Sequence, residues 1–122
     1  MERPLSTANH EDVRRTLTSR YADLDLSTQQ LFLAKAGYWL SLSARETFRP
    51  GTDAVDNAPL LRAFSEAHHR IFDQLIGMMA GSDQRYPDDV FANILVDNVV
   101  NVRLDPAKLL TLLSASELEK PA

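Results

Sequence analysis

Apolar residues recur every three or four positions along most of the chain. The spacing is clearest over residues 58–80, where six apolar positions follow one another in steps of three or four: Leu60, Phe64, Ala67, Ile71, Leu75 and Met78. A second series over residues 8–24 has the same period and contains Val13, Leu17, Tyr21 and Leu24. Because an α-helix places residues with this spacing on one face, the pattern predicts amphipathic helices.

Proline and glycine mark the borders between the predicted helices. Pro50, Pro59, Pro87 and Pro106 all lie between apolar series or at their starts, where proline is tolerated, because it breaks a helix interior. Gly81 follows the third series and suits a helix end. The sequence therefore predicts an all-α single domain over residues 1–122, an irregular four-to-five-helix bundle. The helices are expected at about 8–24, 28–48, 58–80, 88–102 and 106–115.

The helix at 28–48 differs from the others because its apolar residues spread around the whole circumference: Leu31, Phe32, Leu33, Tyr38, Trp39, Leu40 and Leu42. A helix that is apolar all round is buried on more than one side. The pattern therefore leaves two alternatives, a central helix of the bundle or a helix shared with a second subunit. A capping-box sequence over residues 27–30, in which Ser27 is the N-cap, predicts its start.

Residues 99–104 are rich in β-branched side chains, so the end of the fourth helix is left open between helix and extended strand.

Composition narrows the possible functions. The 122 residues contain no cysteine, which excludes disulfides, thiolate metal sites and cysteine nucleophiles. The net charge of −4 disfavours a phosphate backbone as partner, so no nucleic acid is expected. Neither a secretory signal nor an apolar run of about 20 residues is present, so no membrane contact is expected. These features predict an acidic cytoplasmic protein of bacterial type.

The third helix carries the densest set of reactive side chains, including Glu66, His68, His69 and Asp73. The spacing of Glu66 and His69 matches the pair that di-iron bundles direct at one metal. The second pair and the further glutamates of such a site are missing, so no metal and no cofactor is predicted. A surface ladder of i, i+4 ion pairs is the favoured explanation, with Arg62, Glu66 and Arg70 in one series and His69 with Asp73 in another. His68 falls within the apolar arc and is expected to bond a backbone carbonyl or a buried hydroxyl.

A second group of polar residues follows the helix at 28–48, over residues 45–53. Arg45 and Arg49 lie one turn apart near its end, and Thr52 and Asp53 follow in the loop. Two interpretations are open for this group. The arginines form an anion site with Thr52, or they hold the loop in place through Asp53 or Asp56. The second is favoured. A loop of this length is a good place to look for function.

Three segments resemble small all-helical bacterial proteins to which no activity is assigned. They read SARETFRPGTD, LRAFSEAHHRIFDQL and RYPDDVF, and the resemblance covers roughly residues 44–91. The resemblance implies a helical fold. It carries over no activity, cofactor or ligand to this chain.

The sequence favours a non-enzymatic interaction or regulatory module that self-associates as a homodimer or binds another protein. The alternative is a small-molecule- or metal-dependent helical enzyme with a site around the third helix and the loop at 49–57. Its ligand-binding candidates are His68, His69, Glu66, Arg45 and Asp53. No catalytic residue is assigned.

Overall fold

The computed structural model describes residues 10–49, 58–81 and 85–114, and these residues form five α-helices and no strand. The helices are α2 (His10–Asp23), α3 (Leu26–Thr47), α4 (Ala58–Ala80), α5 (Asp88–Asn101) and α6 (Ala107–Leu112). The predicted all-α fold is confirmed. The predicted start of the first helix, residues 8 and 9, and the loop at 50–57 lie outside the described residues.

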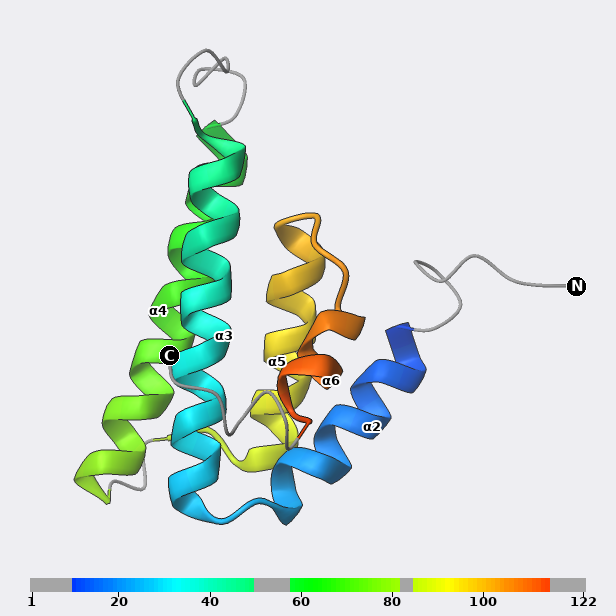
Figure 1. Cartoon of the computed structure of the whole chain (residues 1–122). Helices are drawn as coiled ribbons and strands as arrows, with labels where there is room; N and C mark the ends of the chain where they lie inside the picture. Colours follow the sequence, from blue (N-terminus) through cyan, green and yellow to red (C-terminus); the bar gives the residue numbers. More distant parts are fainter. Residues whose placement is uncertain (1–9, 50–57, 82–84, 115–122) are drawn as a thin grey trace, which may run out of the picture.

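The two longest helices, α3 and α4, pack side by side as an antiparallel hairpin (Figure 1). On one side of this hairpin lie the shorter helices: α5 packs on α4, α2 packs on α5, and α6 contacts α2 and α3. Figure 1 shows that the hairpin extends beyond the upper end of α5. One long pair of helices is thus covered by a smaller group of three.

The core lies between the hairpin and the three shorter helices. The aromatic rings of Phe32, Tyr21 and Phe91 meet at its centre, with ring centroids 5.8 Å apart for Tyr21 and Phe32 and 5.9 Å apart for Tyr21 and Phe91. Burial raises the pKa of the Tyr21 phenol above its ordinary value, and the negative charge of Asp88 raises it further. Tyr21 is therefore a neutral core residue whose hydroxyl donates to the sulfur of Met78.

The start of α3 differs from the capping-box prediction. The N-cap is Asp25, whose carboxylate accepts a hydrogen bond of 2.8 Å from the backbone N–H of Thr28. Ser27 therefore lies inside the first turn. An ionised carboxylate at the positive end of a helix is favoured by the helix dipole as well as by the bond, so Asp25 takes the cap ahead of Ser27.

Helix α5 continues to Asn101, so residues 99–101 are helical and not extended. It ends in a left-handed turn at Arg103, which has φ 64°, and the N–H of Leu104 returns to the carbonyl of Val99. Among the described residues, no helix is long and apolar enough to cross a membrane.

Candidate functional site

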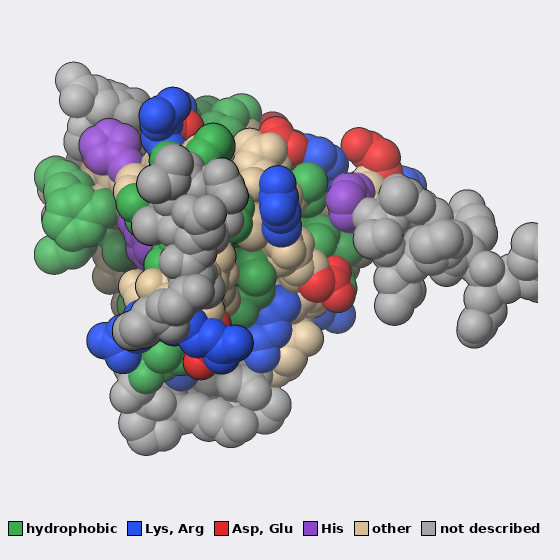
Figure 2. Space-filling view, turned by 90° about the horizontal axis from the view of Figure 1, so that it is seen from above, with side chains coloured by type: hydrophobic (Ala, Val, Ile, Leu, Met, Phe, Trp, Pro, Cys, Tyr) green, Lys and Arg blue, Asp and Glu red, His purple; other side chains and the backbone are tan. Residues whose placement is uncertain are grey.

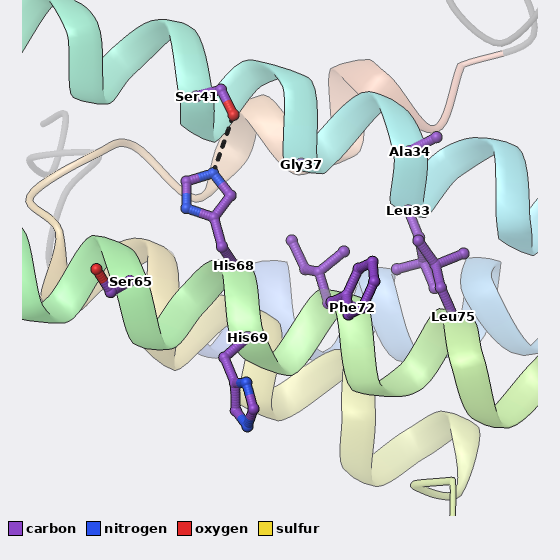
Figure 3. Close-up of a pocket in the computed structure, with 10 residues that line it drawn as sticks. Leu33, Ala34, Gly37, Ser41, Ser65, His68, His69, Phe72 and Leu75 are labelled. Carbon is purple, nitrogen blue, oxygen red and sulfur yellow. Dashed lines mark hydrogen bonds between the residues drawn. The ribbon is translucent and has the colours of Figure 1, made fainter.

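A groove of about 500 Å³ runs between α3 and α4. Its walls are mostly apolar, with a few polar groups, and its size falls in the range of ligand pockets. The lining residues are Leu33, Ala34, Gly37 and Ser41 of α3, and Ser65, His68, His69, Ile71, Phe72 and Leu75 of α4 (Figure 3).

His68 bridges the two helices across this groove. Its Nδ1 lies 2.9 Å from the carbonyl oxygen of Phe64, and its Nε2 lies 3.2 Å from the hydroxyl oxygen of Ser41 (Figure 3). A carbonyl oxygen only accepts, so Nδ1 carries a proton, and in the neutral ring Nε2 accepts from the Ser41 hydroxyl. His68 is half-buried at the wall of an open groove, not enclosed in the core.

The Ser41–His68 pair has part of the arrangement that nucleophilic catalysis needs. A hydroxyl lies beside a possible base, and the second nitrogen of that base is oriented by an acceptor. Acyl transfer also needs hydrogen-bond donors directed at the developing oxyanion. Ser41 and His68 both lie well inside helices, where the backbone N–H groups are already used by the helix. The described part of the groove therefore offers polar anchoring, without a backbone oxyanion hole.

The other histidine of α4 has a different environment. His69 points away from α3 in Figure 3, and its Nε2 lies 3.2 Å from a carboxylate oxygen of Asp73. Glu66 is exposed, and the carboxylate that pairs with His69 is thus Asp73. Within the described ranges, no three His, Asp or Glu side chains are grouped so that they could hold a metal ion.

The remaining sequence candidates are not assembled with the histidines. Arg45 is exposed in the last turn of α3. Arg49 lies 3.6 Å from Glu46. Asp53 lies outside the described residues, so the predicted loop clamp and the predicted anion site are not placed. Arg70, expected in the ladder of ion pairs, donates a 2.6 Å hydrogen bond to the hydroxyl of Tyr86, and this bond raises the pKa of the Arg70 guanidinium.

Large apolar side chains are exposed on both helices of the hairpin. Seven of them are between 38% and 76% exposed, and together they are called the outer face: Leu31, Tyr38 and Leu42 of α3, and Leu61, Phe72, Ile76 and Met79 of α4. Figure 2 shows hydrophobic side chains gathered at one edge of the molecule beside a histidine. The spacing of the seven residues places each row on one stripe of its helix.

Charge is depleted on the α3 half of the outer face. Residues 26–44 contain one charged residue, Lys35, and its side chain is buried, with 8% of the residue exposed. The exposed positions of this stretch are therefore all uncharged, although a quarter of the whole chain is charged. Depletion of charge together with exposed aromatic residues is typical of the centre of a protein interface.

The outer face is also large. A large apolar side chain has on the order of 200 Å² of surface, so seven that are about half exposed present roughly 700 Å². Single chains rarely expose contiguous apolar patches larger than about 300–600 Å². Each partner of a standard protein interface contributes about 800 Å². The outer face therefore has the size of half an interface.

No protein-family model matches the chain, and neither a curated protein nor a solved structure is significantly similar to it. The site therefore has to be interpreted from its own geometry.

Sequence reasoning identified His68 and missed Ser41. The two residues are 27 positions apart on different helices, and only the packing register of α3 on α4 brings them together. The all-round apolarity of residues 28–48 was the signal for the outer face. One apolar side of α3 faces the core, with Phe32, Ala36 and Leu40 fully buried, and the opposite side is exposed.

Proposed function

We propose that the protein is a non-enzymatic interaction module that forms a homodimer through the outer face. The observation that carries the proposal is the uncharged, exposed side of α3 over residues 26–44, together with the exposed apolar row of α4 in the same hairpin. The favoured occupant of this face is a second copy of the chain. A two-fold dimer buries the same patch on both subunits, and the apolar area suffices for one.

Burial of this face has a low electrostatic cost. Taking a charged side chain out of water is expensive unless it is paired, and the exposed positions of α3 over residues 26–44 carry no charge. The charged residues of α4, such as Arg62, Glu66 and Asp73, lie on the flank turned away from α3. They border the apolar row of α4 on one side, as polar residues border the apolar centre of a protein interface.

Two parts of the proposal rest on composition alone. The net charge of −4 argues against nucleic acid as the partner. We also propose that the dimer acts in the cytoplasm, since a chain without cysteine does not use the disulfides that an oxidising compartment permits.

A second candidate function is favoured by the Ser41–His68 pair. The groove has the volume of a small-molecule site, and the Ser41 hydroxyl and the His68 ring place two polar groups on an apolar wall. Such a site suits an uncharged, mainly apolar molecule with one hydrogen-bonding group. This candidate is the enzyme-like alternative, and it requires a groove that remains open in solution.

A matched pair of variants tests the homodimer. Ile76 of α4 and Val90 of α5 are both β-branched and helical, with 49% and 44% of their surface exposed, but only Ile76 belongs to the outer face. We expect Ile76→Glu to weaken dimerisation at least ~10-fold, because it buries a charge, and Val90→Glu to leave it unchanged. Sedimentation equilibrium measures both. Equal behaviour of the two variants contradicts the assignment of this face.

A further inference from the structure

We infer that in the homodimer proposed above, Phe72 of each copy inserts into the groove of the other copy at Gly37, with the two hairpins parallel. This inference rests on the proposed function and adds to it the register of the two copies. It makes the groove a receptor for a phenyl ring supplied by the second subunit.

The groove has space at Gly37. A Cβ atom built on Gly37 meets only one atom within 4 Å, the Cγ2 of Ile71 at 3.9 Å. This residue lies inside α3, where glycine costs roughly 0.5–1 kcal/mol relative to alanine. The helix thus gives up stability at a position where no neighbouring atom of the same chain excludes a side chain. A ring from outside can reach the backbone of α3 there.

Phe72 has the properties of the inserted group. It is 62% exposed and stands at the rim of the groove on α4, directly after Ile71, which contacts the Gly37 position. Figure 3 shows Phe72 across the groove from Gly37. Aromatic residues that fill pockets on a partner are the commonest anchors of protein interfaces. The projecting ring and the open position therefore lie at the same height along the hairpin.

Two-fold symmetry then determines the direction of the hairpins. In a symmetric dimer, when Phe72 of one copy meets Gly37 of the other, Gly37 of the first also meets Phe72 of the second. Because both positions lie at the same height on neighbouring helices, a two-fold axis in the interface satisfies both contacts only when it runs parallel to the helices. The two α3–α4 hairpins are then parallel, with α4 of each copy lying over the groove of the other.

Complementary variants test this register. Phe72→Ala removes the ring, and Gly37→Leu fills the receiving space. We expect each variant alone to dimerise at least ~30-fold more weakly than the wild type. In a mixture, the intact Phe72 of the Gly37→Leu chain meets an open groove, and the new leucine fills the space left by the missing ring. The mixed dimer is expected to be at least ~10-fold tighter than either variant dimer.

Gly37→Ala is the matched control, because it adds a Cβ where space exists and leaves most of the groove open. Circular dichroism establishes that all variants remain helical, and native mass spectrometry with an isotope label on one chain separates mixed from like pairs. If the wild type dimerises but the mixture shows no preference for mixed pairs, the register is wrong and the homodimer stands. If the wild type is monomeric, both proposals fail.

Disulfide trapping tests the parallel direction independently. The sequence contains no cysteine, so only the introduced cysteines can form a cross-link. Leu31 and Met79 lie at one end of the hairpin, and Leu61 lies at the other. A Leu31→Cys chain is expected to cross-link with a Met79→Cys chain and not with a Leu61→Cys chain. The opposite result indicates antiparallel hairpins and overturns the inference.

Discussion

The side chain of Gln74 holds the backbone of Tyr86 through two hydrogen bonds. Its Nε2 donates to the Tyr86 carbonyl at 3.0 Å, and its Oε1 accepts from the Tyr86 N–H at 2.8 Å. Gln74 is fully buried in α4, and Tyr86 precedes α5. The Gln74 side chain satisfies both backbone groups of Tyr86, as a neighbouring strand would. It therefore fixes where the start of α5 lies against α4.

Replacement of Gln74 tests this contact. Gln74→Leu keeps the volume and leaves the N–H and carbonyl of Tyr86 without their partner, so we expect a loss of about 2–4 kcal/mol in the free energy of unfolding. Urea denaturation followed by circular dichroism measures it. Gln30→Leu, at a half-exposed glutamine of α3, is the control and is expected to change stability by less than about 0.5 kcal/mol. Similar losses for the two variants contradict the role of Gln74.

Two helical glycines are expected to respond with opposite signs to the same substitution. A Cβ on Gly77 lies 2.7 Å from the Cβ of Arg85, so Gly77→Ala forces the backbone before α5 away from α4. We expect it to destabilise the protein by about 1–3 kcal/mol. Gly37→Ala meets open space and is expected to stabilise the chain by about 0.5–1 kcal/mol. Thermal unfolding measures the stability of both variants. A Gly77→Ala variant that is more stable than the wild type contradicts the close contact with Arg85.

The Ser41–His68 hydrogen bond is expected to contribute modestly to stability. A double-mutant cycle of Ser41→Ala and His68→Ala should give a coupling energy of about 0.5–1.5 kcal/mol. The cycle of Ser41→Ala with His69→Ala should give a value near zero, because His69 points away from α3, which carries Ser41. Denaturant unfolding provides all the energies. Equal coupling in the two cycles contradicts the bridge across the groove.

The helix cap at Asp25 predicts a dependence of stability on pH. Hydrogen bonds from the side chain and backbone of Thr28 lower the pKa of the Asp25 carboxyl in the folded protein. A group whose pKa is lower in the folded than in the unfolded state stabilises the fold above its unfolded pKa, and this contribution is lost as pH falls through the folded pKa. We therefore expect Asp25→Asn to be less stable than the wild type at pH 7, with the difference shrinking in acid. A difference that stays constant from neutral to acidic pH contradicts this role.

The sequence was informative where local spacing alone decides the structure. The six apolar residues from Leu60 to Met78 predict the face that α4 turns to the core, because helix geometry fixes their relative directions. Gly81, with φ 63°, ends this helix, as a residue without a Cβ readily does. These features require no knowledge of what the helix packs against.

The sequence was less informative where two residues compete for one role, or where a contact joins residues that are far apart in the chain. Asp25 and Ser27 are both good N-caps; the capping-box spacing pointed to Ser27, whereas the charge of Asp25 at the positive end of the helix favours Asp25. Gln29 lies within the capping-box segment predicted at 27–30, but its amide donates to the carbonyl of Tyr21 and to Asp88, which lies 59 residues away. The contact between Ser41 and His68 depends in the same way on the register of two helices, which no spacing within one helix reveals.

The mass of the wild-type protein in solution reports directly on the proposed homodimer. The outer face predicts a homodimer, so sedimentation equilibrium over about 1 to 100 µM protein should give a mass that approaches twice 13.7 kDa at the upper end. Ile76→Glu should shift that equilibrium toward the single chain, while Val90→Glu leaves it in place. A wild-type mass that stays at 13.7 kDa across the whole range contradicts the homodimer.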